Sequence, residues 1–419
     1  MNAREQRGKV IAETCVIVKT GNVWKVPSQS TGGTYSVNLE RTYCSCPDFA
    51  EHGNPCKHYF AVKFSISKTE THADGSETTT TVTVEKVKKP TYKQSWPEYN
   101  ASQVHEHDHF QHFLADICES LPAPEYKRGR PPIHPSTLAF SAIYKVYSTM
   151  SARRFSGDLT ESQERNHIDH KPHYNVVLKF LESKSSTPML EQLVRLSAAP
   201  LAAVETVFAT DSTGFSGSSY HRWFDEKYGR ERSQIKWIKL HATIGVKTNV
   251  IVACKVMDKD SSDNTQFPDL VKDASERFQI DEMSADKAYT SRGSFAAMDE
   301  IGGQFYPAFK KGSTGKVGGS YEKAFLLMKL NGEDYAKHYH QRSNSESTFS
   351  ALKRKFGHAL RAKTDVAMAN EALAKVICYN LTCVIQEMYV LGIDPEFVIK
   401  ARKPRSPELA AAIPPSMPF

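Results

Sequence analysis

The segment TVFATDSTGF (residues 206–215) is an apolar run that carries one acidic residue, Asp211. Its branched and aromatic residues predict a β-strand. Five later stretches continue the pattern: strands in WIKLHATIGV (237–246) and NVIVACKVMD (249–258), a helix in FPDLVKDASERF (267–278), and strands in DEMSADKAY (281–289) and FYPAF (305–309). Long helices are expected between Tyr321 and Gly392. Strands followed by alternating helix and strand indicate a mixed α/β domain over 201–395.

The sequence on either side of this domain changes character. Spacing of apolar residues by three and four predicts helices over 101–200, a region that could also bind DNA. Residues 1–64 read as a compact β-rich module with short strands around Gly turns. The Thr- and Lys-rich stretch 65–100 reads as a linker, with one extended segment at Thr80–Val87. The Pro-rich tail, 396–419, is expected to be flexible.

Composition limits the class of protein. The 419 residues are 40% hydrophobic, and the net charge of +7 is compatible with a nucleic-acid partner. No run approaches the roughly 18 apolar residues that span a bilayer, and MNAREQRGKV lacks the apolar stretch of a signal peptide. These features predict a cytoplasmic protein. Five cysteines that lie singly among apolar residues predict buried free thiols: Cys15, Cys118, Cys254, Cys378 and Cys383.

The other three cysteines form a cluster with a histidine. Cys44 and Cys46 make a C-x-C pair, nine residues separate them from Cys56, and His58 completes a C-x-H pair. Three thiolates and an imidazole form a closed tetrahedral set, which suits structural rather than catalytic zinc. His52 lies nearby, although a solvated loop histidine is the simpler interpretation. The order of ligands resembles the SWIM zinc finger, which implies a module that binds DNA or another protein.

Three carboxylates fall in segments that suggest a shared site. Asp211 lies on a predicted strand, Asp286 follows an apolar stretch, and Glu346 lies on a predicted polar helix. Carboxylate oxygens suit hard divalent cations, and two such ions can clamp a phosphodiester and activate water.

The helix around Glu346 adds a second pattern. Tyr339, Arg342, Glu346 and Lys353 fall within a stripe about 60° wide if the helix is continuous, at about 100° per residue. This stripe is not a core pattern. A solvated face with an i,i+4 ion pair between Arg342 and Glu346 is the alternative.

Together these residues resemble the DDE transposases of one large group of insertion sequences. The spacing Y-x2-R-x3-E-x6-K matches that group's signature, and ATDSTGF and SADKAYTSR resemble its first and second Asp motifs. GRPPIHP (129–135) resembles its Gly-Arg-Pro stretch. The resemblance extends from about residue 90 to 390 and implies an α/β catalytic domain of RNase H-like fold, with a mixed sheet flanked by helices.

The resemblance also implies the chemistry. Asp211, Asp286 and Glu346 would hold two Mg²⁺ (or Mn²⁺) ions, water would cut DNA at the transposon ends, and the freed 3′-OH would attack target DNA. Arg342 and Lys353 would contact DNA phosphates, and Tyr339 would position the DNA or pack the helix. Other members carry a large insertion between the second Asp and the Glu. The 60 residues between these positions here leave little room for one, so hairpin chemistry that depends on the insertion is in doubt.

Positive charge is concentrated near the proposed site. Residues 336–419 hold 12 Lys/Arg against 7 Asp/Glu, which gives +5 of the net +7. Lys353, Arg354 and Lys355, with Arg361 and Lys363 beyond them, are predicted to contact the DNA backbone. Other basic or aromatic candidates are Lys127, Arg128, Arg130, Arg153, Arg154 and the run His221, Arg222 and Trp223.

Two alternatives compete with an active transposase. A captured or decayed element would keep the zinc module and the fold but no longer cut DNA. Another RNase H-like endonuclease would share the acids but not the Tyr–Arg–Glu–Lys pattern. A transposase joins two DNA ends, so the family resemblance also implies a homodimer or a larger synaptic complex.

Overall fold

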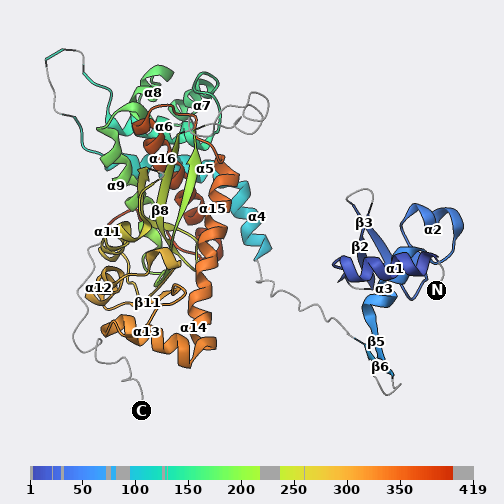
Figure 1. Cartoon of the computed structure of the whole chain (residues 1–419). Helices are drawn as coiled ribbons and strands as arrows, with labels where there is room; N and C mark the ends of the chain where they lie inside the picture. The colour runs from blue at the N-terminus through green and yellow to red at the C-terminus, as the bar shows by residue number, and fades with distance from the viewer. Residues whose placement is uncertain are drawn as a thin grey trace. The chain divides into compact units, whose positions relative to one another are not determined.

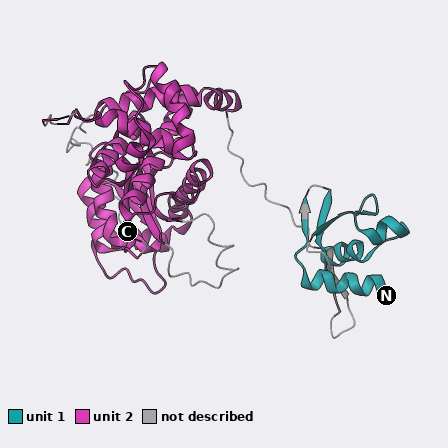
Figure 2. Ribbon diagram, turned by 90° about the horizontal axis from the view of Figure 1, so that it is seen from above, with its two compact units in different colours: residues 1–93 teal, residues 94–419 magenta. Residues whose placement is uncertain are grey.

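The computed structural model describes residues 3–20, 22–29, 33–71, 77–81, 95–124, 128–129, 131–217, 236–258 and 260–399. The chain divides into two compact units, residues 1–93 and 94–419, which Figure 2 shows in different colours. Each unit is described separately.

The first unit is built on a four-stranded antiparallel sheet. Its strands follow chain order: β1 (Val18–Thr20), β2 (Val23–Pro27), β3 (Thr34–Asn38) and β4 (Tyr43–Cys44). Three helices accompany the sheet: α1 (Ala3–Thr14), α2 (Pro47–His52) and α3 (Lys57–Ile66). The strand-rich module is therefore confirmed. The alternating pattern of apolar residues in this part of the sequence did not predict the helices α1, α2 and α3.

Close packing of α1 on α3 forms the core of this unit. Ile11, Val26 and Val37 are fully buried in it. A Cβ at Gly8 would lie 2.7 Å from Phe60 Cβ, so only glycine allows this approach. Beyond α3, β5 (Ser67–Thr71) pairs antiparallel with β6 (Glu77–Thr81) within the predicted linker, and the residues of Thr80–Val87 beyond 81 lie outside the described part of the chain.

The second unit contains a mixed five-stranded sheet. Its order is β11 (Gln304–Pro307), β10 (Glu282–Ala285), β7 (Val207–Ser216), β8 (Trp237–Gly245) and β9 (Ile251–Asp258). The three strands β7, β8 and β9 are antiparallel neighbours, whereas β10 is parallel to both β7 and β11. This is the mixed sheet expected of the RNase H-like fold, and the α/β prediction is confirmed.

Helices flank the sheet and form a separate helical region (Figure 1). The helical region comprises α4 (Trp96–Val104), α5 (Glu106–Glu119), α6 (Pro135–Tyr147), α7 (Ala152–Glu164), α8 (Tyr174–Glu182) and α9 (Ser186–Ala198). The helices after β9 are α11 (Asp263–Ser275), α12 (Arg292–Ile301), α13 (Gly319–Leu330), α14 (Gly332–Tyr339), α15 (Ser343–Phe356) and α16 (Asp365–Leu391). Short 3₁₀ turns occupy Ala199–Leu201, Lys287–Tyr289 and His340–Arg342.

The long helix α16 joins the helical region to the sheet. It packs against α9, α6 and α5, and its buried residues continue the same core as the strands. Asn380 on α16 accepts a hydrogen bond from Ile251 N at 2.9 Å and donates to Ile251 O at 2.8 Å. Its side chain thus pairs with the backbone N–H and C=O of Ile251 at the free edge of β9. In the described part of the chain, no helix is long and apolar enough to cross a membrane.

Two segment predictions need correction. The predicted strand 281–289 ends at Ala285, the last residue of β10 that pairs with β7 and β11. Residues Lys287–Tyr289 form a 3₁₀ turn, which Tyr289 N closes by donating to Asp286 O at 3.0 Å. The predicted helix 267–278 begins earlier, at Asp263, and ends at Ser275. A proline at position 268 falls within its first two turns.

Candidate functional site

Two of the three predicted acids lie close together at neighbouring strands: Asp211 is on β7, and Asp286 directly follows β10. Strand β10 pairs in parallel with β7, and the register aligns Ala285 with Thr210. Asp286 and Asp211 each follow by one residue. Adjacent strands lie about 4.8 Å apart, and residues in register point to the same face of a sheet. The sheet therefore brings together two carboxylates that are separated by 75 residues in sequence.

The Asp211 carboxylate is held by several donors. Its Oδ2 accepts from Arg342 at 2.8 Å and from Ser345 Oγ at 3.0 Å, and its Oδ1 accepts from Ser212 N at 2.8 Å. Burial raises the pKa of Asp211, and the nearby charge of Asp286 acts in the same direction. The positive charge of Arg342 lowers the free-energy cost of keeping the buried Asp211 carboxylate ionised.

Glu346 is connected to this centre through Arg342. The guanidinium donates to Glu346 Oε1 at 2.7 Å as well as to Asp211, so it bridges the two acids. The Glu346 side chain is 64% exposed, against 18% for Asp211. In the described part of the chain, the carboxylate oxygens of Asp211, Asp286 and Glu346 do not all lie within 4.8 Å of one another. Arg342 occupies the space between Asp211 and Glu346.

The helix α15 runs along one face of β7. Asp211, Thr213 and Phe215 alternate along the strand and so share a face. Arg342 and Ser345 meet Asp211 at the start of α15. Two turns further on, Lys353 Nζ donates to Thr213 Oγ1 at 2.7 Å and lies 5.3 Å from the centre of the Phe215 ring.

The predicted continuous stripe is interrupted. The 3₁₀ turn His340–Arg342 separates α14 from α15, so Tyr339 ends one helix and Arg342 precedes the next. A 3₁₀ turn advances about 120° per residue, so residues three apart eclipse, and Tyr339 stays near the line of Arg342 although the α-helix is interrupted. The structure brings Arg342 and Lys353 to β7, and Glu346 is joined to them through its ion pair with Arg342. The Tyr339 ring packs beside the ring of the neighbouring His340.

A second polar network lies beside Asp211 and was not predicted. Asp263, at the start of α11, accepts from Ser212 Oγ at 3.2 Å and from Lys239 at 2.5 Å. His241 Nδ1 lies 3.3 Å from the same carboxylate, and burial lowers the pKa of His241 to about 4. Asp263 has no motif around it in the sequence; the pairing of β7 with β8 places Ser212 opposite His241, and the start of α11 adds Asp263.

The other basic candidates differ in their surroundings. Lys355 forms an ion pair with Glu106 at 2.8 Å, whereas Arg354 is exposed and donates only to Ser350 at 3.3 Å among the described residues. Arg361 donates to Met150 O at 2.6 Å, and Lys363 to Gly217 O at 3.1 Å. Arg153 packs over the Tyr174 ring, and Arg154 and Arg128 are exposed. The candidates Lys127, Arg130, His221, Arg222 and Trp223 lie outside the described residues.

The four predicted zinc ligands converge in the first unit. The ligand atoms of Cys44, Cys46, Cys56 and His58 all lie within 4.8 Å of one another, and all four residues are buried. Zinc bonds of about 2.3 Å to sulfur in a tetrahedron put ligand atoms roughly 3.8 Å apart. The Cys56 Sγ to His58 Nδ1 distance is 3.8 Å. The residues therefore fit a structural zinc ion.

Local structure holds these ligands in place. Cys46 caps α2 by accepting from Phe49 N at 3.4 Å, and Cys56 directly precedes α3. The contact between the Cys44 and Cys56 sulfurs lowers the pKa of Cys56 and raises the pKa of Cys44. His52 lies outside the cluster: its Nδ1 is 3.4 Å from an Asp48 carboxylate oxygen, on an exposed side chain.

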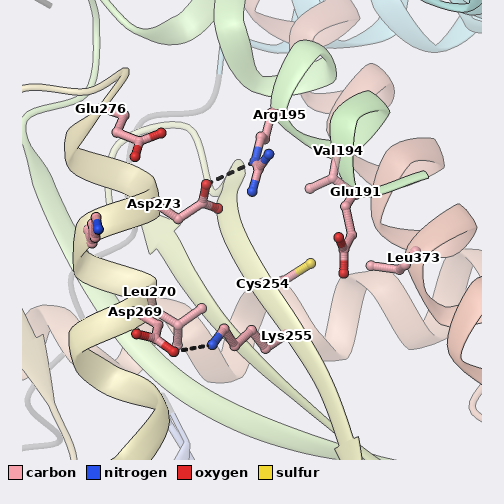
Figure 3. A pocket seen from close by; sticks show the side chains of 11 residues that line it. Glu191, Val194, Arg195, Cys254, Lys255, Asp269, Leu270, Asp273, Glu276 and Leu373 are labelled. Atoms are coloured by element: carbon pink, nitrogen blue, oxygen red, sulfur yellow. Dashed lines mark hydrogen bonds and ion pairs between the residues drawn. The ribbon is translucent and has the colours of Figure 1, made fainter. Parts of the chain in front are cut away.

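A cavity of about 300 Å³ lies away from Asp211, Asp286 and Glu346, between α9, β9 and α11 (Figure 3). Two ion pairs join charged side chains of its lining. Arg195 pairs with Asp273 at 2.8 Å, and Lys255 pairs with Asp269. The edge strand β9 is separated from β7 by β8, so this cavity is not part of the carboxylate site.

Comparison with known families agrees with both sites. Residues 202–381, which include Asp211, Asp286 and Glu346, match the transposase DDE domain. Residues 35–66, which include the four zinc ligands, match the SWIM zinc finger. The two matches agree with the resemblance to a DDE transposase that carries an N-terminal SWIM zinc finger.

Proposed function

We propose that this protein is an active transposase that cuts DNA at transposon ends and joins the freed ends to target DNA. The observation that carries this proposal is the convergence of Asp211 and Asp286 at adjacent parallel strands, with Arg342 linking Asp211 to Glu346. The match to a transposase DDE domain supports it.

Asp211, Asp286 and Glu346 are the residues that would hold two Mg²⁺ ions. Their oxygen donors suit a hard cation, and Asp211 is already held where burial makes a positive neighbour favourable. When bound, the ions would activate the attacking oxygen and neutralise charge on the phosphodiester. For Glu346 to join Asp211, the Arg342 guanidinium must move from between them.

Arg342, once displaced, is placed to donate to a DNA phosphate instead of the two acids. A planar guanidinium binds phosphate with two parallel hydrogen bonds, which makes this exchange favourable. Lys353 and Arg354 lie further along α15 and would contact the backbone of the same strand. Lys355 would do so only after it separates from Glu106. Tyr339 precedes this helix and would help to position the DNA end.

The reaction has two steps. Water attacks the phosphodiester at the transposon end and releases a 3′-OH, and this hydroxyl then attacks a phosphodiester of target DNA. Two ends must be joined, so we infer a homodimer or a larger synaptic complex. The zinc module would add contacts to DNA or to another protein, and the reaction would take place on DNA in the cytoplasm.

A strand-transfer assay tests the proposal. DNA that carries the inverted repeats flanking the gene is incubated with the full chain and Mg²⁺, and joined products are separated from cut products. We expect joined products with the wild type and none with Asp286→Asn. Cutting without joining would identify an endonuclease instead, and no reaction with the wild type would identify a DNA-binding protein that no longer cuts.

A further inference from the structure

A second cavity of about 300 Å³ lies where the helical region meets the end of α15. Segments far apart in the sequence line it: the end of α6, residues 354–361, and two residues of α16. At about 30 Å³ per water molecule, it has room for roughly ten waters. This cavity is separate from the one in Figure 3, which lies between α9, β9 and α11.

The lining of this cavity is strongly basic. Five cationic side chains face one carboxylate, Glu371, for a net charge of 5 − 1 = +4: Lys145, Arg354, Lys355, Arg361 and Lys375. Lys355 is neutralised by Glu106 outside the lining, which leaves +3. The cavity in Figure 3 differs, because its Arg195 and Lys255 each pair with a carboxylate.

The loop that closes the cavity is fixed from both sides. The Glu371 carboxylate accepts from Arg361 N at 3.0 Å and from Ala362 N at 2.8 Å. Lys375 Nζ donates to Gly357 O at 2.8 Å and to Ala359 O at 2.9 Å. Glu371 is therefore occupied with backbone N–H groups, and the shape of the cavity does not depend on a ligand.

Lys145 is the group without a partner. It is only 5% exposed, and its ammonium forms no hydrogen bond or ion pair within the described part of the chain. Burial lowers the pKa of Lys145, and the Glu371 charge only partly opposes that shift. Lys145 Nζ is not among the enclosed unpaired atoms of the described residues, so it reaches the open space of the cavity, where an anionic ligand would give it a partner.

We infer that this cavity is a phosphate-binding pocket that takes one backbone phosphate of the bound DNA, with Lys145 and Arg354 as its main contacts. The inference rests on the proposed function. Arg354 follows Glu346 by eight residues, which is about 12 Å along the helix. One DNA strand carries a phosphate every 3.4 Å of axis, so this separation corresponds to roughly three or four nucleotides for a strand that runs along α15. The helical region thus contributes a DNA contact through α6.

A salt titration of DNA binding tests this pocket. Binding of a duplex with the element end is measured by fluorescence anisotropy in the absence of Mg²⁺, so that no cutting occurs. Lys145→Met keeps the packing of the side-chain stem and removes the charge. Loss of one phosphate contact is expected to reduce the slope of log K against log salt by about 0.9, and to weaken binding about fivefold near 0.15 M salt.

Lys255→Met is the matched control. It removes the same charge from a cavity of the same size, but from a lysine that Asp269 already neutralises, so the slope should not change. Arg354→Gln, at an exposed position, gives a second measurement that does not depend on tolerance of the buried change. An unchanged slope in both Lys145→Met and Arg354→Gln would overturn the inference.

Inorganic phosphate distinguishes a free anion from DNA. It should raise the Tm of the wild type, relative to chloride at equal ionic strength, and not that of Lys145→Met. If phosphate does so while the DNA slope is unchanged, the pocket binds a free anion and the DNA assignment is wrong. The catalytic proposal is tested separately, because Asp286→Asn should abolish cutting without changing this slope.

Discussion

Arg342 is predicted to stabilise the metal-free protein by bridging two acids of unequal burial. Its contact with Asp211 joins side chains that are 21% and 18% exposed, whereas Glu346 is 64% exposed. A hydrogen bond to a charged group is worth about 1.5–3 kcal/mol when shielded, and an exposed pair about 0–1 kcal/mol. We therefore expect a coupling of about 2 kcal/mol for Arg342 with Asp211 and below about 1 kcal/mol with Glu346.

Double-mutant cycles measure these couplings directly. The changes Arg342→Met, Asp211→Asn and Glu346→Gln are made singly and in pairs, and the free energy of unfolding of the zinc-loaded protein is measured in urea without added Mg²⁺. The ion pair between Lys236 and Asp365, at 2.7 Å with side chains 57% and 76% exposed, provides a surface control. Its coupling should lie at about 0–1 kcal/mol.

Divalent cations should weaken the stronger coupling. If Mg²⁺ binds where the guanidinium now lies, it competes with Arg342 for Asp211, and the coupling measured with Mg²⁺ falls. A coupling between Arg342 and Asp211 no larger than that of the surface control would refute the bridging role. A coupling that does not respond to Mg²⁺ would refute the competition.

Three further predictions concern other parts of the chain. Cys56→Ser, or a chelator, should abolish bound zinc and the cooperative unfolding of residues 1–93, because zinc binding of this kind supplies about 10–16 kcal/mol of folding free energy. Metal analysis and circular dichroism of the full chain measure the two effects. Gly8→Ala should destabilise the same unit by about 1–3 kcal/mol through the clash with Phe60, which urea unfolding measures. Burial and the charge of Glu205 raise the pKa of Glu387 from 4.5 to about 7. The folded state therefore has its full stability from this group below pH 4.5, where Glu387 is protonated in both states, and loses that stability as pH rises through about 7. Glu387→Gln should therefore raise the free energy of unfolding by on the order of 3 kcal/mol above about pH 8 and have little effect near pH 5. An equal effect at both pH values would show that Glu387 does not titrate between them.

Local sequence patterns predicted the strands and the zinc cluster. Asp211 lies on a strand whose apolar residues are recognisable without knowledge of its partners. The four zinc ligands fall within fifteen residues, so their spacing alone constrained how they could meet. The helix α1 was missed because its hydrophobic residues are few, and its packing depends on a single glycine at position 8.

Long-range contacts were beyond such patterns. Ser345 donates to Asp211 across 134 positions, and nothing in its neighbourhood distinguishes it from other serines. Lys145 appears in the sequence as one residue of an apolar helix, and its role emerges only when residues 354–361 and α16 close around it. The 3₁₀ turn before α15 was missed because polar residues without Gly or Pro give no helix-breaking signal at 340–342.

The most direct test of the central claim is a change of metal preference at Asp286. Asp286→Cys replaces an oxygen ligand by a thiolate, which binds Mg²⁺ poorly and softer ions better. Cutting of element-end DNA is measured with Mg²⁺ and then with Mn²⁺. We expect Asp286→Cys to be inactive with Mg²⁺ and to regain cutting with Mn²⁺, while the wild type works with both. Equal cutting by Asp286→Cys and wild type in Mg²⁺ would contradict the claim that Asp286 holds the catalytic metal.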